Sequence, residues 1–450
     1  MTDPDQSPDA LPVDGAPDDR HYLRAVTDMA ERRAVVTQEP IYNLKGMKLV
    51  DKGLRVDRQV HDRLRQHQLR QRFDAYLTVE NMVTVESVLE VARLHCQTDT
   101  LAGLWVYALA DERGEDRLLA PVRSMLLPQP LAFMLTVMRE QHPALFAHSV
   151  RMMLTALFLG IQTGWSDRDC VHLACAALLH DVGALYMDPV WHDPANRITG
   201  AGRKQLAAHP VTAMQLIQAQ NVYPRSVAQA VLEHHECMDG SGYPRGLPGE
   251  RISPMGQILL VAEMVAAFFE KYADEAPAQR LSLTLRLNHR KYPAALVACL
   301  LPVLQIGVLH KDMRVAQEDV ENTIALLSQA FSVWETLSAP LPAQALLPAS
   351  GQACAFVAER LAALQKTLFE AGSHPQQQAE ALPHLRGDAQ SLAELALLGR
   401  EALWQLQHIV DATHSRWPQL AESTDPGDAA VLQWRNTCAA RLAAPPGAAP

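Results

Sequence analysis

The chain has 450 residues, of which 48% are hydrophobic and 20% are charged, and its formal net charge is −10. A chain of this length can form two or three domains that each bury a core, and the composition excludes a largely disordered protein. The net negative charge argues against a broad duplex-binding face, so we expect no duplex nucleic acid as a partner. The seven cysteines include no C-x-x-C pair, a pattern typical of a reducing compartment.

The chain begins with an acidic, Pro-rich stretch, and residues 1–35 are predicted to form a disordered tail. This stretch has neither the basic start nor the apolar run of a signal peptide. We therefore expect a cytoplasmic protein.

A small mixed α/β module is predicted over residues 36–125. Within it, residues 41–57 alternate apolar and polar side chains around Gly46 and Gly53. This pattern predicts two or three short strands joined by tight turns. A helical spacing of apolar residues, which includes Leu77, follows up to about residue 110.

Residues 126–310 consist almost entirely of amphipathic helical pattern, interrupted by Gly and Pro loops. Ser166 precedes Asp169 by three residues, a capping-box pattern that predicts the start of a helix. The apolar run at 293–309 is broken by Pro302 and is shorter than the roughly 20 residues that a spanning helix needs. No membrane span is therefore expected.

Residues 311–450 are predicted to form a helical C-terminal extension. The stretches 354–371 and 389–414 have Leu and Ala stripes at helical spacing, and the Pro-rich segment 338–351 interrupts the helical pattern. Such stripes favour a bundle core over a binding face. The predicted fold class is therefore mainly α, with a helical bundle core, a small mixed N-terminal module and a helical C-terminal extension.

Several histidines and carboxylates fall on the inward side of the predicted middle helices. They are His148, His180, Asp181, His209, His234, His235 and Glu263. We expect one helix to stop at His209 and Pro210 to lie in the first turn of the next. Glu263 lies in the apolar run ILLVAEMVAAFF, where a buried carboxylate is costly unless it is paired or metal-bound.

Taken singly, each of these histidines is better explained as an ordinary core or surface residue. Taken together, imidazoles and carboxylates that converge on one helical interior favour a transition-metal site, with iron or manganese before zinc. Two ions roughly 4 Å apart lower the pKa of a shared water towards neutrality. This is hydrolytic chemistry suited to a phosphodiester.

The segment HHECMDGSGYPRGLPGERI at residues 234–252, together with His180 and Asp181, resembles the signature of the HD-GYP family. The spacings between the other candidate ligands are also similar to those of the family. The resemblance implies an HD-type helical core for residues 126–310. It also implies a bacterial phosphodiesterase that hydrolyses cyclic di-GMP to pGpG or GMP, with His180 and Asp181 as catalytic residues.

By that resemblance the seven residues named above would be ligands of two divalent transition-metal ions, iron or manganese, and Asp181 would bridge them. The family places an Asp at the position of Glu263, whose extra methylene should still allow ligation. The GYP loop is implied to contact the nucleotide or a protein partner. Its residues are Gly242, Tyr243, Pro244 and Arg245.

The sequence departs from the family mainly at positions that contact substrate. Ala184 stands where the family usually has a phosphate-binding Lys, and the basic Arg-Pro-Tyr segment after the last carboxylate is absent. Each charge-assisted bond to phosphate contributes roughly 1.5–3 kcal/mol, so the loss of two weakens binding on the order of 100-fold or more.

This loss leaves an alternative open: a weak or inactive relative that senses cyclic di-GMP or binds a protein through the GYP loop or the C-terminal region. A hydrolase of another small phosphoester stays open as well. So does a homodimer.

Overall fold

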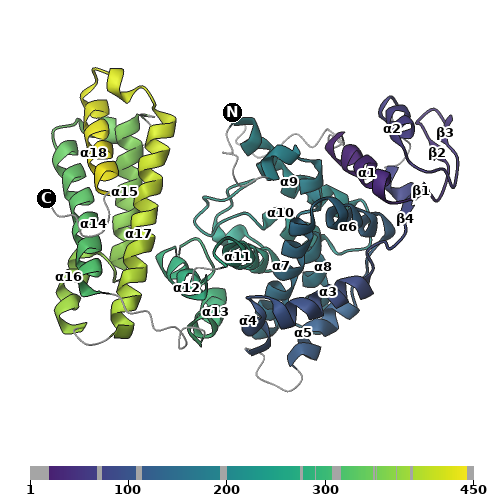
Figure 1. Ribbon diagram of the computed structural model, residues 1–450, viewed down its shortest axis with the longest axis horizontal. Helices are drawn as coiled ribbons and strands as arrows, with labels where there is room; N and C mark the ends of the chain where they lie inside the picture. The colour runs from purple at the N-terminus through teal and green to yellow at the C-terminus, as the bar shows by residue number, and fades with distance from the viewer. Residues whose placement is uncertain are drawn as a thin grey trace, which may run out of the picture. The chain divides into compact units, whose positions relative to one another are not determined.

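The structure, a computed structural model, describes most of the chain. The described residues are 20–67, 73–107, 114–192, 200–273, 277–288, 290–306, 316–347, 350, 352–370, 372–385 and 389–442. The chain divides into an N-terminal unit, residues 1–273 with 290–299, and a C-terminal unit, residues 274–289 with 300–450 (Figure 1). Both units are built mainly from α-helices, which confirms the predicted fold class. The domain boundaries predicted at residues 36, 126 and 311 stay predictions.

The N-terminal unit begins with α1 (Arg20–Arg32), so the prediction of a disordered tail was wrong for residues 20–32, while residues 1–19 lie outside the described residues. Tyr22, Val26 and Met29 recur at helical spacing and are buried. α1 packs against α6 (Gln129–Gln141) and the 3-10 helix η2 (Val182–Tyr186), where the rings of Tyr22 and Tyr186 lie 4.9 Å apart. This apolar contact explains why the segment is helical despite its acidic, Pro-rich surroundings.

In the described part of the chain, four short strands form two antiparallel pairs. They are β1 (Val35–Thr37) with β4 (Leu77–Val79), and β2 (Ile41–Tyr42) with β3 (Lys48–Val50). Gly46 and Gly53 both have φ of +77°, a backbone region that glycine adopts without strain. The strands and tight turns predicted within residues 41–57 are therefore confirmed for β2 and β3.

Leu77 lies in β4 and not in a helix, which corrects the helical interpretation of that position. Leu77 and Val79 point to the same side of the strand and are both buried, an alternation of period two that a helical reading of the wider window obscured. The helical pattern is instead realised from Val85 onward. The helices of this part are α2 (Arg58–Arg65), α3 (Val85–Thr98), α4 (Ala102–Tyr107) and α5 (Gly114–Arg123).

A bundle of long helices forms the core of the N-terminal unit. It contains α6, α7 (Pro143–Gln162), α8 (Asp167–Leu179), α9 (Gly200–Gln218), α10 (Arg225–Glu233) and α11 (Pro254–Lys271). α7 packs against α8 and α11, and α10 packs against α9 and α11. α8 begins as predicted, since the Ser166 hydroxyl accepts a hydrogen bond from the Asp169 amide at 3.2 Å.

α7 is the one described helix that is long and apolar enough to cross a membrane by length and composition alone. Of its most apolar window, 72% is buried inside the protein. Its contacts with α6, α8 and α11 account for this composition. α7 is therefore the central helix of the bundle.

α9 continues through Pro210, so the prediction that a helix stops at His209 was wrong. Proline inside a helix removes one backbone hydrogen bond and costs roughly 3 kcal/mol. Packing offsets this cost: a Cβ on Gly183 would lie only 2.1 Å from the His209 carbonyl oxygen, so η2 lies directly against the α9 backbone. Close contact on this side and with α10 holds the helix together across the proline.

The C-terminal unit is a helical bundle with an apolar interior. Its helices are α12 (Pro277–Leu287), α14 (Gln317–Ser338), α15 (Ala353–Glu370), α16 (Pro375–Ala381), α17 (Ala389–Arg416) and α18 (Pro426–Leu442), while α13 (Ala294–Ile306) spans the division between the units. α15 and α17 match the two predicted stretches, and Trp434, fully buried, donates from its indole nitrogen to the Ala330 carbonyl at 3.0 Å. The predicted helical extension is confirmed.

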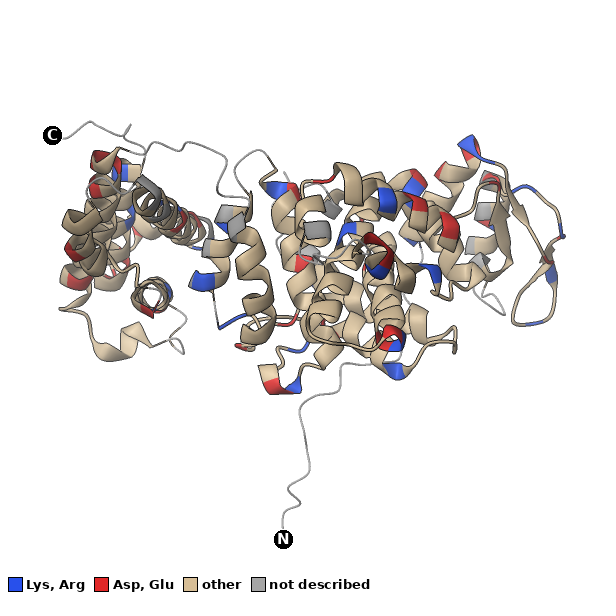
Figure 2. Cartoon of the chain, turned by 90° about the horizontal axis from the view of Figure 1, so that it is seen from below, with Lys and Arg blue, Asp and Glu red and all other residues tan. Residues whose placement is uncertain are grey.

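Charged residues of both signs are scattered over the helices of both units (Figure 2). Lys and Arg lie next to Asp and Glu, as in the exposed pair of Arg123 and Asp116. The described charged residues of each unit are therefore of mixed sign.

Candidate metal centre

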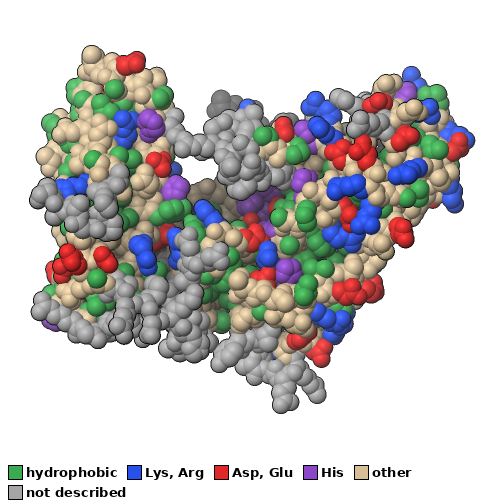
Figure 3. All heavy atoms as spheres, viewed as in Figure 1, with side chains coloured by type: hydrophobic (Ala, Val, Ile, Leu, Met, Phe, Trp, Pro, Cys, Tyr) green, Lys and Arg blue, Asp and Glu red, His purple; other side chains and the backbone are tan. Residues whose placement is uncertain are grey.

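The seven predicted ligands come from five segments of the N-terminal unit and meet in its interior. They lie on α7 (His148), in the turn between α8 and η2 (His180, Asp181), on α9 (His209), after α10 (His234, His235) and on α11 (Glu263). Their donor atoms form two groups, each with all atoms within 4.8 Å of one another. In the space-filling view, histidine side chains are visible in a hollow of this unit near α10 and α11 (Figure 3).

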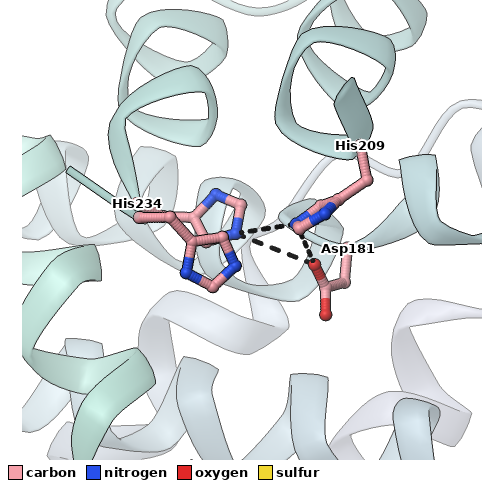
Figure 4. A group of neighbouring side chains, drawn as sticks. Asp181, His209 and His234 are labelled. Carbon is pink, nitrogen blue, oxygen red and sulfur yellow. Dashed lines mark hydrogen bonds and ion pairs between the residues drawn. The ribbon is translucent and has the colours of Figure 1, made fainter. Parts of the chain in front are cut away.

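The first group consists of Asp181, His209, His234 and His235. The Nε2 atom of His209 lies 3.1 Å from Asp181 Oδ1 and 3.3 Å from His234 Nε2, and His234 Nε2 lies 3.7 Å from Asp181 Oδ1. Figure 4 shows these three side chains pointing toward one another from separate segments. Two imidazole nitrogens and a carboxylate oxygen therefore face one small space.

The second group consists of His148, His180 and Glu263. Glu263 Oε2 lies 2.8 Å from His148 Nε2 and 3.4 Å from His180 Nε2, so the longer side chain does reach both imidazoles. His180 Nε2 also lies 3.3 Å from Asp181 Oδ2. Asp181 thus turns one oxygen to each group.

Backbone carbonyls select the tautomer of two of these histidines. His180 Nδ1 lies 2.8 Å from the Ala177 carbonyl, and His234 Nδ1 lies 2.6 Å from the Val231 carbonyl. Because a carbonyl oxygen only accepts, the proton of each ring is on Nδ1. In the neutral form of each ring the Nε2 lone pair therefore points into the site, as metal ligands require.

Burial makes this arrangement unfavourable without a cation. His180 and His234 have no exposed surface, and within the described part of the chain His180 Nε2 and Asp181 Oδ1 are buried without a hydrogen-bond partner. Acceptor atoms of imidazole and carboxylate groups that are removed from water and have no donor carry a large desolvation penalty. A donor set of imidazole and carboxylate suits a divalent transition metal, so the residues fit the ions that the sequence predicts.

Burial and neighbouring charges shift the pKa values of the site in opposite directions. For His180, burial lowers the pKa, but Asp181 and Glu263 outweigh burial and raise it to about 9. For both carboxylates, burial raises the pKa, but the facing imidazoles hold it well below its usual range. For His234 and His235, burial and neighbouring imidazoles lower the pKa, to about 4 in His235. Near pH 7 the carboxylates are therefore ionised and the last two imidazoles neutral, the forms that bind metals.

The GYP loop packs against the segment after α10 that carries His235 and Glu236. The buried Glu236 carboxylate accepts hydrogen bonds from the Arg245 and Leu247 amides at 2.8 and 2.9 Å. A Cβ on Gly242 would lie 2.3 Å from Glu236 Cα, so this position requires glycine. The Tyr243 ring stacks on His235 with ring centroids 4.7 Å apart. Of the four predicted substrate contacts, Tyr243 is therefore placed directly beside the donors.

The guanidinium of Arg245 forms an ion pair with the buried Glu233 at 2.9 Å. Glu233 also accepts hydrogen bonds from the amide and hydroxyl of Ser253. Arg245 thus has a structural partner that sequence analysis did not identify. The signal was present, because Glu233 and Glu236 flank the histidine pair in the text EHHE.

Glu270 also contacts a predicted ligand, although no motif of the sequence indicates it. It lies on α11 seven residues after Glu263, so both carboxylates are on one face of the helix. Its Oε1 and Oε2 atoms lie 3.1 and 3.2 Å from His148 Nδ1. The seven-residue spacing, although not a motif, could have indicated it.

Known proteins are similar to this chain over the region that contains the seven donors. Residues 134–288 match the family model for the HD domain. The 3'3'-cGAMP-specific phosphodiesterase 3 of Vibrio cholerae is 30% identical over 141 residues, which cover 31% of this chain and 30% of the relative. The cyclic di-GMP phosphodiesterase response regulator RpfG of Xanthomonas campestris is 34% identical over 119 residues, which cover 26% of this chain and 31% of the relative.

A third relative, the cyclic di-GMP phosphodiesterase PdeB of Borreliella burgdorferi, is 29% identical over 120 residues, or 27% of this chain and 31% of the relative. Each match thus spans less than a third of the curated relative. Among solved structures, an HDG"Y"P protein from Bdellovibrio bacteriovorus matches with a TM-score of 0.34 and 13% identity, over 60% of this chain and 95% of that one. The HD domain match contains all seven donors and the GYP loop, so this region of the chain is similar to the HD domain family.

Proposed function

We propose that this protein is a metal-dependent phosphodiesterase that hydrolyses a cyclic dinucleotide, with cyclic di-GMP as the first candidate. The observation that supports this most is the convergence of seven N and O donors, four of them from buried side chains, in one helical interior. The substrate class is suggested by relatives whose names state activity on cyclic di-GMP or 3'3'-cGAMP. The products would be pGpG or GMP.

The donors divide into two sets that would hold two divalent ions, iron or manganese. Asp181, His209, His234 and His235 would hold one ion, and His148, His180 and Glu263 the other. We assign Asp181 a bridging role because its two oxygens face the two sets. When bound, such ions neutralise phosphate charge and lower the pKa of a water.

Side chains of the protein would position the substrate and the reacting centre. His180 and Asp181, which we propose as the catalytic residues, position the reacting centre between the two donor groups. Tyr243, stacked on His235, would orient the substrate beside them. Glu233 and Glu236 hold the loop that carries Tyr243, so the position of its ring is set before substrate binds.

The direct test is turnover by metal-loaded protein. The protein is loaded separately with Mn²⁺ and Fe²⁺, its metal content is measured, and cyclic di-GMP or 3'3'-cGAMP is added. We expect linear dinucleotide or GMP to accumulate, followed by chromatography. Absence of product from both substrates, in a sample with two ions per chain, would reject the proposal.

A paired variant experiment tests the assignment of the site. His180→Ala combined with Asp181→Ala removes donors from both groups and is expected to abolish metal binding and turnover. Tyr243→Ala is the matched control, because it should leave both ions bound while weakening substrate binding. Equal metal content in wild type and the double variant would contradict the assignment.

A second candidate function is a cyclic dinucleotide sensor with little or no turnover. Two observations favour it. Ala184, which takes the place of a phosphate-binding Lys in the family, is buried, and the guanidinium of Arg245 is already paired with Glu233. Calorimetry that shows binding of cyclic di-GMP to metal-loaded protein, in samples without turnover, would select this function.

A further inference from the structure

His148 differs from the other donors because both of its ring nitrogens face carboxylates. Its Nε2 lies 2.8 Å from Glu263, within the second donor group, and its Nδ1 lies 3.1 Å from Glu270, outside that group. The two carboxylates lie on the same face of α11 and hold the ring from either end. Only 9% of the His148 side chain is exposed, so the geometry of the ring is set by these two contacts.

The Nδ1 contact decides what Nε2 can do. In His180 and His234, a backbone carbonyl holds the proton on Nδ1 and leaves the Nε2 lone pair for a cation. His148 lies inside α7, and its Nδ1 points to Glu270. An ionised carboxylate accepts from Nδ1–H more strongly than a carbonyl does and makes Nε2 a stronger donor to a metal.

Glu270 is itself held in place by a chain of charged contacts. Arg151, three residues after His148 on α7, donates to Glu270 at 2.9 Å and to Asp99 at 2.6 Å. Asp99, only 3% exposed, also contacts His95 on α3 at 2.8 Å. The Arg151 guanidinium holds the Glu270 carboxylate beside His148, and Asp99 in turn holds the guanidinium.

We propose that Glu270 is a positioning residue of the metal centre: it orients His148 and fixes its tautomer so that Nε2 binds the ion held with His180 and Glu263. This inference rests on the proposed function only in requiring that the two donor groups bind cations. Arg151 and Asp99 support Glu270. The first donor group, around His209 and His234, has no part in this network.

The test is stepwise binding of Mn²⁺ alone, followed by electron paramagnetic resonance, to wild type, Glu270→Gln and Glu270→Ala. The alanine variant should bind one of the two ions about 10–100-fold more weakly, which is the usual effect of losing a residue that hydrogen-bonds to a metal ligand. Its affinity for the other ion should not change. Glutamine keeps an acceptor oxygen without the charge and should lose less. Asp116→Asn, which breaks the exposed ion pair with Arg123, is the matched control and should change neither step.

A second readout follows the ring directly. In ¹⁵N-histidine-labelled protein loaded with Zn²⁺, protonated and metal-bound ring nitrogens have widely separated shifts. We expect a single histidine to change its pattern in Glu270→Ala. Unchanged affinity for both ions, or equal weakening of both, would overturn the proposal, since a general loss of stability affects both groups alike.

Failure of this inference and failure of the proposed function give different results. A wild type that binds two Mn²⁺ ions but does not hydrolyse a cyclic dinucleotide rejects the proposed function and leaves the Mn²⁺ titration of the variants valid. A wild type that does hydrolyse one, with variants that bind both ions as tightly as wild type, rejects the role of Glu270 alone.

Discussion

Helices α7–α11 and helices α14–α18 follow the same amphipathic pattern but enclose different interiors. The first set buries His148, His180, His209 and His234 next to two carboxylates. The second set buries an apolar cluster around Trp434, and Glu401 is the one buried carboxylate among its described residues. Apolar packing alone is thus enough to hold a helical bundle, so the buried polar groups of the first set point to a ligand.

The largest loss of stability is expected in the apolar interior of the C-terminal unit. Trp434→Ala removes a fully buried indole and its hydrogen bond to Ala330, and should destabilise the C-terminal unit by about 3–5 kcal/mol. Urea unfolding with hydrogen exchange of α14 and α18 measures this, and metal binding should not change. Trp404→Ala is the matched control, because that side chain is 39% exposed and should cost far less.

A smaller loss is expected where the metal centre depends on close backbone packing. Gly183→Ala places a Cβ 2.1 Å from the His209 carbonyl oxygen, so η2 and the α9 backbone must move apart. We expect the N-terminal unit to lose up to about 3 kcal/mol and to bind metal more weakly, because His209 moves with the helix. Gly103→Ala has open space at its Cβ and should not be destabilising; equal effects of the two variants would contradict the packing argument.

Metal removal should destabilise the N-terminal unit and leave the stability of the C-terminal unit unchanged. An ion that binds only the folded state stabilises by about 2.7 kcal/mol at 100 times its Kd. Treatment with a chelator should therefore increase hydrogen exchange in α8, α10 and α11 and leave α15 and α18 unchanged. Equal loss of protection in both sets of helices would contradict this expectation, since it would mean that the ions do not act specifically on the interior of the N-terminal unit.

The smallest of these effects is expected at Asp99, which anchors the charged contacts around Glu270. Burial raises the pKa of Asp99, but hydrogen bonds from His95 and Arg151 lower it well below its usual range. A depressed pKa stabilises the folded state above the unfolded pKa of roughly 3.9, and this stabilisation is lost as pH falls through the folded pKa. Asp99→Asn should cost about 2 kcal/mol at pH 7, less than a fully buried pair because Arg151 is 26% exposed.

Denaturation curves at several pH values measure the difference in free energy of unfolding between wild type and Asp99→Asn. It should stay constant from neutral pH down to about 5 and narrow below about 4, where the unfolded wild type begins to take up a proton. A difference that grows on acidification would mean that the carboxylate is not stabilised as an ion.

Much of the fold and of the donor set could be predicted because each rests on local pattern. The helical periods of α15 and α17 and the Ser166 cap are short-range signals, and the structure confirms them. The convergence of His148 with Glu263 was predicted from family spacing, and the structure brings the two together at 2.8 Å. The metal ligand roles stay predictions, and so do the protein partner and the dimer.

What could not be predicted depends on contacts between distant segments. Residues 20–32 are helical because α1 packs on α6 and η2, which the composition of the tail does not reveal. The helix through Pro210 is held by Gly183, far from it in sequence. Glu270 acquires its role only from Arg151 and His148 on another helix. In each case tertiary contact outweighs the local signal.

The way the GYP loop is fastened has a consequence for engineering. The Glu236 carboxylate and the glycine at position 242 fix the path of the loop. Tyr243 extends from the loop and lies beside the donors. The residues that anchor the loop are thus different from the half-buried tyrosine that contacts the donor site. Libraries randomised at Tyr243 and Pro244 could retune ligand preference while the scaffold keeps its shape.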